Sequence, residues 1–225
     1  FSVVPSCLSY DPTFGYEMAV IIHYGLKRMY QDQDDVFFYI TAMNENYLQP
    51  AMPDGVEDGI CRGMYRYSQS KKRKGNRVQL LGSGAILCEV IKAADILESQ
   101  FSVACDIWSV TSFNELRKDL QRVQRLNRLN VESSDHISYV AQCFDQVKGP
   151  FIAATDYMKI YADQIRSEVP GTYTVLGTDG FGRSDTRAAL RDFFEVNAAM
   201  IAYSALKSLH DDGDYSTTDL KAAVK

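Results

Sequence analysis

The chain has 225 residues, of which 46% are hydrophobic, and its formal net charge is −5. This is enough for one large domain with a substantial core, or for one domain plus part of another. The negative charge argues against a nucleic-acid-binding protein, because such proteins neutralise phosphates with Lys and Arg. No apolar run approaches the roughly 18 residues of a membrane span, and the first residues lack the features of a signal peptide. We therefore expect a cytoplasmic protein that binds neither nucleic acid nor membrane.

The five cysteines are scattered along the chain without a CxxC pair. They are Cys7, Cys61, Cys88, Cys105 and Cys143. An odd number without close spacing argues against a disulfide framework and against a zinc site. We expect most of them to be small buried hydrophobes, since a thiol nucleophile needs a nearby base and the chain has only three histidines.

The first part of the chain predicts a β-α-β unit. Residues 3–10 mix β-branched and apolar types and predict a strand. Apolar residues then recur at helical spacing over residues 13–31, with Thr13 as the expected N-cap and Glu17 in the first turn. Residues 36–42 are apolar and aromatic and predict a second strand, which we expect to be parallel to the first.

Polar side chains follow both of these strands. Tyr10 and Asp11 end the first strand, and Asn44, Glu45 and Tyr47 follow the second. Because adjacent parallel strands end at the same edge of a sheet, we expect these groups to lie close together, where ligands approach open α/β sheets. The alternative is that they only satisfy the backbone of the two loops.

The rest of the chain alternates between predicted strands and helices. Residues 54–77 are polar and link the two parts, with a basic loop at residues 70–75. We predict strands at 78–81, 102–110, 151–154 and 173–176, and helices at 85–99, 114–126, 157–168, 185–194 and 198–209. Ser184 or Asp185 is the expected cap of the helix over 185–194, and Ser216 or Thr217 that of a last short helix. A polar loop runs to about residue 149, and 137–143 within it predicts a short helix or strand. This order predicts a three-layer α/β/α domain with a mostly parallel sheet of four or five strands.

The segment Gly82-Ser83-Gly84 follows a strand and opens a helix. A dinucleotide-binding fingerprint needs a third glycine, but position 87 is Leu. The segment therefore predicts a tight strand-to-helix turn rather than a phosphate-binding loop.

Six segments occur in an order that resembles one known family. They are residues 9–12, 44–53, 78–84, 109–113, 155–159 and 175–185. The chain resembles the C-terminal portion of the homodimeric bacterial-type pyruvate dehydrogenase E1 component, a transketolase-like, thiamine diphosphate-dependent enzyme. The resemblance implies that residues 1–52 end a pyrimidine-binding domain, that 53–77 are a linker, and that 78–225 form a transketolase-like C-terminal domain.

The resemblance also implies an activity, a cofactor and partners. Family members are homodimers that decarboxylate pyruvate with thiamine diphosphate and Mg²⁺. They reductively acetylate the lipoyl group on the lipoyl domain of their partner E2, the dihydrolipoyl acetyltransferase. The metal, the diphosphate and the activating glutamate are held upstream of this segment, so the resemblance implies no metal ligand and no certain catalytic or cofactor-binding residue here. We therefore expect the isolated chain to be inactive.

In the family, the loops after the first two strands line the substrate side of the thiamine pocket. The resemblance thus implies a substrate pocket formed by Tyr10, Asn44, Glu45, Tyr47 and Leu48. Well-known members have a histidine at the position of Leu48, which leaves the preferred 2-oxo acid open. One alternative is an E1 component for another short 2-oxo acid, such as 2-oxobutyrate.

A second alternative belongs to a different class, a non-catalytic dimerisation or E2-docking module. Its contact surfaces would be the acidic turns and the basic loop at residues 71–74. Under this alternative, charge reversal at residues 71–74 weakens E2 docking, whereas under the first reading docking does not change.

The segment Thr178-Asp179-Gly180 is similar to the Asp-Gly pair of the thiamine diphosphate motif. That motif has an asparagine some 25 to 30 residues later, and Mg²⁺ prefers such oxygen ligands. Here the nearest downstream asparagine is Asn197, which comes too early. We expect a turn before a helix rather than a metal site.

Overall fold

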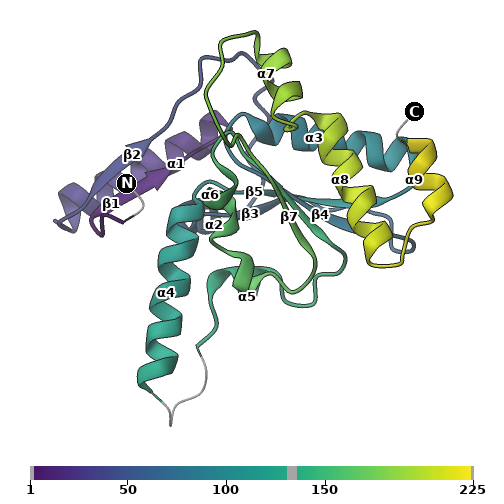
Figure 1. Cartoon of the computed structure of the whole chain (residues 1–225). Helices are drawn as coiled ribbons and strands as arrows, with labels where there is room; N and C mark the ends of the chain where they lie inside the picture. Colours follow the sequence, from purple (N-terminus) through teal and green to yellow (C-terminus); the bar gives the residue numbers. More distant parts are fainter. Residues whose placement is uncertain (1–2, 131–135, 224–225) are drawn as a thin grey trace.

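The computed structural model describes residues 3–130 and 136–223, so part of the predicted polar loop, residues 131–135, lies outside the described residues. The chain forms a two-stranded sheet and a five-stranded sheet. Figure 1 shows the two-stranded sheet with its helix at one side of the larger unit. Within the described ranges, no helix combines the length and the apolar character that a membrane span requires.

The two-stranded sheet is the predicted β-α-β unit. Strand β1 (Cys7–Tyr10) pairs in parallel with β2 (Phe37–Ile40). Helix α1 (Gly15–Leu26) connects them and continues into a π-helical turn, η1 (Lys27–Gln31). The prediction of a parallel unit is confirmed, although the α-helix ends before the predicted residue 31.

The start of α1 differs from the prediction. The N-cap is Phe14 rather than Thr13, and the Glu17 carboxylate accepts hydrogen bonds from the Thr13 and Phe14 backbone N–H groups at 2.5 and 2.9 Å. The Thr13 hydroxyl donates instead to the Gly84 carbonyl, at 2.7 Å. Thr13 does not cap the helix because its hydroxyl is bound to another part of the chain and Glu17 satisfies the free N–H groups.

The five-stranded sheet has the order β3-β5-β4-β6-β7 and is parallel except for β3. Its strands are β3 (Tyr65–Ser68), β4 (Arg77–Gly82), β5 (Ala104–Ser109), β6 (Phe151–Ala154) and β7 (Tyr173–Leu176). The four strands predicted after residue 77 are confirmed. Strand β3 and helix α2 (Glu57–Arg62) lie in the segment that the sequence analysis described only as a polar link.

Helices cover both faces of this sheet, which confirms the three-layer architecture (Figure 1). One face carries α3 (Ile86–Gln100), α8 (Ala198–Asp211) and α9 (Thr217–Ala223). The other face carries α4 (Phe113–Leu129), α5 (Tyr139–Cys143) and α6 (Lys159–Asp163). The apolar helix α8 packs into the core. As expected for a capping residue, Ser216 Oγ accepts from the Asp219 N–H at the start of α9.

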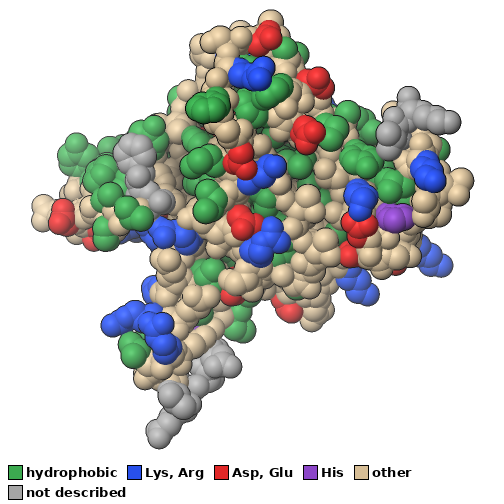
Figure 2. Space-filling view, viewed as in Figure 1, with side chains coloured by type: hydrophobic (Ala, Val, Ile, Leu, Met, Phe, Trp, Pro, Cys, Tyr) green, Lys and Arg blue, Asp and Glu red, His purple; other side chains and the backbone are tan. Residues whose placement is uncertain are grey.

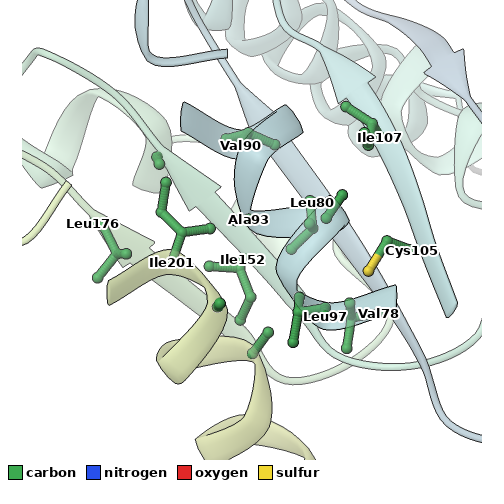
Figure 3. Packing of buried hydrophobic residues seen from close by; sticks show 14 of the residues in the cluster. Val78, Leu80, Val90, Ala93, Leu97, Cys105, Ile107, Ile152, Leu176 and Ile201 are labelled. Carbon is green, nitrogen blue, oxygen red and sulfur yellow. The ribbon is translucent and has the colours of Figure 1, made fainter. Parts of the chain in front are cut away.

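Figure 3 shows the core beneath α3 and α8. Leu80 from β4 and Ile152 from β6 meet Val90 and Leu97 from α3 and Ile201 from α8, and all five side chains are fully buried. Burying a side chain of this size stabilises the fold by about 1.5–3 kcal/mol. This face of the five-stranded sheet is therefore closed by a packed core under α3 and α8.

Two predicted helices have different bounds in the structure. The helix expected at 157–168 is α6 followed by a 3₁₀ turn, η2 (Arg166–Glu168). The helix expected at 185–194 is α7 (Arg187–Phe193). Its cap is Thr186, whose hydroxyl oxygen accepts from the Ala189 N–H, so the prediction of Ser184 or Asp185 as the cap is wrong.

Candidate functional site

The loop that follows β2 runs from the two-stranded sheet to α7, and Figure 1 shows the two side by side. Arg191 on α7 binds the Glu45 carboxylate with both terminal nitrogens, at 2.6 and 3.1 Å. Arg187, one turn earlier, donates to the Asn44 side-chain oxygen and lies 3.6 Å from Glu45. Two of the predicted site residues are thus brought together by arginines that the sequence analysis did not single out.

Further acidic groups surround Arg191. Its guanidinium lies 3.4 Å from the Glu89 carboxylate on α3. Glu89 also accepts a hydrogen bond from the Ala198 N–H, at the first turn of α8, where the helix dipole favours a negative charge. Burial raises the pKa of the nearby Asp156 carboxyl, and the Arg191 charge opposes that shift. The loop after β2, helix α3 and the segment at Asp156 therefore meet around the guanidinium group of Arg191 on α7.

Tyr47 and Gln49 hold the next part of the loop to the start of α1. The Tyr47 hydroxyl donates to the Thr13 carbonyl, and Gln49 Oε1 accepts from the Gly15 N–H at 2.8 Å. Burial is the main reason that the pKa of Tyr47 rises to about 12. Glu45 and Tyr47 line the same hollow of about 330 Å³ beside this helix start, so the structure places these two predicted site residues together.

Leu48 and Tyr10, two other predicted site residues, do not line this hollow. The Leu48 side chain is 92% exposed and stands on the surface. Tyr10 is buried, its hydroxyl donates to the Cys61 carbonyl at 2.7 Å, and its ring stacks on Phe38. It lines a separate hollow of about 190 Å³. In this chain the Tyr10 hydroxyl is bound to backbone rather than directed to the Glu45 hollow.

Asp11 is a buried carboxyl at the end of β1 that the sequence analysis noted but did not propose as a site residue. It accepts from the Thr41 hydroxyl at 2.5 Å. Burial raises its pKa to about 6, although hydrogen bonds from Thr41 and Ser83 act in the opposite direction. A side chain at Gly84 would lie 2.6 Å from Asp11 Oδ2, and Gly84 has a φ of +52°. The expected tight turn at residues 82–84 is confirmed, and it packs against a carboxyl group.

Glu17 is a second buried carboxyl, and it joins the two sheets. One of its oxygens accepts from the Tyr65 hydroxyl on β3 and the Ser109 hydroxyl on β5, at 2.7 and 2.6 Å. The other oxygen accepts from the two N–H groups at the start of α1. Burial raises the pKa of Glu17 in spite of these bonds. The sequence showed only a first-turn glutamate.

Asp179 and Asn197 do not fit a Mg²⁺–diphosphate site. Asp179 Oδ1 accepts from the Lys159 N–H at 2.9 Å, and Asn197 Oδ1 accepts from the Met200 N–H as the cap of α8. Both oxygens are engaged in local backbone bonds. Over residues 3–130 and 136–223, the His, Cys, Asp and Glu side chains form no group of three or more that could hold a metal ion. The expectation of a turn at residues 178–180 agrees with the positive φ of Gly180.

Comparisons with known proteins match two families in chain order. Residues 1–50 match the pyruvate dehydrogenase E1 component middle domain, and residues 63–197 match the transketolase-like TK C-terminal domain. The pyruvate dehydrogenase E1 component of Pseudomonas aeruginosa is 54% identical over 99% of this chain, and that of Cupriavidus necator 48% identical over 100%. The E1 component of Escherichia coli K12 is 49% identical over 94%. The chain spans about a quarter of the length of these relatives.

Solved transketolases share the fold at low sequence identity. A transketolase from Leishmania mexicana superposes with a TM-score of 0.62 at 12% identity, over 96% of this chain and 27% of that chain. One from Campylobacter jejuni has a TM-score of 0.58 at 17% identity, over 92% of this chain and 27% of that chain. A split-gene transketolase, described as an inactive β4 tetramer, has a TM-score of 0.57 at 14% identity, over 93% of this chain and 60% of that chain.

Proposed function

Since this chain belongs to the family of transketolase-like C-terminal domains and begins with a segment of the pyruvate dehydrogenase E1 middle domain, we propose that it is part of an E1 component. The proposed enzyme decarboxylates pyruvate and reductively acetylates the lipoyl group of E2, the dihydrolipoyl acetyltransferase. The observation that carries this proposal is the 54% identity with a pyruvate dehydrogenase E1 component over nearly the whole chain.

We propose that the loop after β2 supplies the substrate side of the site. Glu45 and Tyr47 line one hollow, and Asn44 is held beside them by Arg187. The Tyr10 ring packs on Phe38 of β2 and so stabilises the strand that precedes this loop. Leu48 is exposed and accessible to a substrate or to another part of the full-length protein. In this proposal Asn44, Glu45 and Tyr47 bind and orient a short 2-oxo acid.

The proposed cofactors are thiamine diphosphate and Mg²⁺, held by parts of the enzyme outside this chain. When bound, the cofactor supplies the electron sink for decarboxylation, and the protein supplies position and electrostatics. The donor atoms of the described residues support this division, since the Asp179 and Asn197 oxygens are engaged elsewhere. We therefore propose that the isolated chain is inactive and binds thiamine diphosphate poorly.

We further propose that residues 1–52 end a pyrimidine-binding domain and that 78–225 form the C-terminal domain. Residues 53–77 link the two, and their strand β3 extends the five-stranded sheet. Phe37 and Tyr39 in β2 support the assignment of residues 1–52 to a larger domain, because 46% and 42% of their surface is exposed. Figure 2 shows hydrophobic side chains gathered over β1, β2 and α1. Phe37 and Tyr39 are alternate residues of the strand and therefore lie on one face of the sheet, and a contiguous exposed apolar face marks an interaction site. We also propose that the full-length protein is a cytoplasmic homodimer that binds the lipoyl domain of E2.

The test is the rate of the full-length protein with thiamine diphosphate, Mg²⁺ and an artificial electron acceptor, with pyruvate and 2-oxobutyrate in parallel. We expect turnover with a preference for pyruvate. A preference for 2-oxobutyrate would make Leu48 a specificity residue, because one methylene changes discrimination by about 1–3 kcal/mol. Absence of turnover with both acids would reject the proposed enzymatic activity and favour the alternative of a non-catalytic dimerisation or E2-docking module.

A further inference from the structure

Arg191 stands between two carboxylates from different parts of the chain. It lies 2.6 and 3.1 Å from the two oxygens of Glu45, and 3.4 Å from the nearer oxygen of Glu89. Its side chain is 13% exposed, against 23% for Glu45 and 9% for Glu89. A pair so far withdrawn from solvent has a more fixed geometry than a surface pair, and loss of one partner leaves the other partly desolvated.

We propose that Arg191 is a positioning residue for the reaction. It fixes the direction of the Glu45 carboxylate at the hollow that Glu45 and Tyr47 line. This inference rests on the proposed function, because it takes Glu45 as a group on the substrate side of the site. Through Arg191 on α7, the C-terminal domain then determines the geometry of a loop that belongs to the preceding domain.

The geometry requires an arginine rather than any cation. A guanidinium fork matches both oxygens of a carboxylate, whereas an ammonium group acts as a single point of charge. Arg187 also approaches Glu45, but at 3.6 Å and with 50% of its side chain exposed. The two arginines are four residues apart on α7, where like charges repel unless an acidic group lies between them. Glu45 is the acidic group that they share.

Glu89, the second carboxylate beside the Arg191 guanidinium, is also held in place. Glu89 is anchored at the first turn of α8 by the Ala198 N–H, at 3.1 Å. The loop that carries Glu45 is fixed on its other side by Tyr47 at the start of α1. Glu45 is therefore oriented by side chains from α7 and α3, and not by its own loop alone.

A double-mutant cycle in the full-length protein tests this inference. The variants are Glu45→Gln, Arg191→Met and the double substitution, assayed with thiamine diphosphate, Mg²⁺ and pyruvate. We expect each single substitution to lower kcat about ten- to a hundredfold with little change in KM, since displacing a reacting geometry by 1 Å can cost that much. The double variant should fall less than about twofold below the slower single variant, because both remove the same interaction. Arg191→Lys should retain an intermediate kcat.

Lys92→Met is the matched control. It removes a cation from the same Glu89 carboxylate without touching Glu45, and its side chain is 63% exposed, so kcat should not change. If the effects of Glu45→Gln and Arg191→Met multiply, or if Arg191→Met keeps its kcat while Glu45→Gln loses it, the inference is overturned. If Arg191→Met does not fold, Arg191→Lys takes its place in the cycle. Full activity of Glu45→Gln would refute the role of Glu45 together with this inference, while wild-type turnover would still support the E1 assignment.

Discussion

Buried carboxyl groups hold the joint between the two sheets. Asp11 lies at the end of β1 and Glu17 in the first turn of α1, and both are at least nine-tenths buried. Burial disfavours a charged carboxylate, and hydrogen-bond donors offset part of that cost. Both side chains accept hydroxyl donors from other segments of the chain. The local stability of the joint should therefore depend on pH.

Asp11 gives the clearest expected pH dependence. Its pKa is raised from an ordinary value of 3.8 to about 6, so the folded chain favours the protonated form. The stability from this group is present below about pH 4 and is lost as the pH rises through about 6. Replacing Asp11 by Asn should remove this dependence, which corresponds to about 2 kcal/mol between pH 4 and pH 7.

Urea unfolding of the 225-residue chain at several pH values measures this change. Asp95→Asn is the control, since Asp95 is exposed on α3. Equal pH dependence in the Asp11 variant and in the wild-type chain would contradict the prediction.

Glu17 should contribute through its hydrogen bonds. Glu17→Gln keeps the size of the side chain but turns an NH₂ group toward donors such as the Tyr65 and Ser109 hydroxyls. We expect the free energy of unfolding at neutral pH to fall by about 1.5–3 kcal/mol. Urea denaturation measures the loss, with the exposed Glu57→Gln as control. A change as small as that of the control would show that the network does not stabilise the joint.

At the scale of the site, the sequence predicted the loop but not the residues that orient it. Asn44, Glu45 and Tyr47 were predicted from their place after a strand, and the structure brings all three to one region. Arg191 was not singled out because a single sequence does not show which charge on an exposed helix has a partner. The spacing of Arg187 and Arg191 was a usable signal, since like charges four residues apart need an acidic group nearby.

At the scale of elements, strand and helix order after residue 77 followed from hydrophobic periodicity. Strand β3 was not located because it is four residues long, polar in part, and lies at the edge of the sheet. Whether these residues form a strand depends on their pairing with β5, which is far away in the sequence. The cap of α7 was misplaced by one or two residues because Ser184, Asp185 and Thr186 are all good caps.

The turn before β6 offers a test of backbone packing. Gly149 has a φ of +91°, and a Cβ there would lie 1.9 Å from the Arg77 carbonyl oxygen. Gly149→Ala should destabilise the chain by more than about 3 kcal/mol, because strain adds to a backbone clash. Gly180→Ala is the matched control, since Gly180 has a φ of +92° and nothing within 4 Å. Equal unfolding midpoints for the two variants would refute the role of the close contact.

At the scale of the whole molecule, the chain combines a complete three-layer unit with a two-stranded sheet that exposes aromatic residues. The five-stranded sheet has helices on both faces and a closed core. The smaller sheet carries the loop with Glu45, and α7 of the larger unit holds that loop. This arrangement fits the proposal that the loop after β2 forms the substrate side of a site in the full-length protein.

The most direct test of this account is transfer of acetyl to a lipoyl domain. The full-length protein is mixed with pyruvate, thiamine diphosphate, Mg²⁺ and a lipoylated E2 domain, and the mass of that domain is measured. We predict the mass increase of reductive acetylation with the full-length protein and no increase with the 225-residue chain alone. No acetylation by the full-length protein, or acetylation by the isolated chain, would contradict the account.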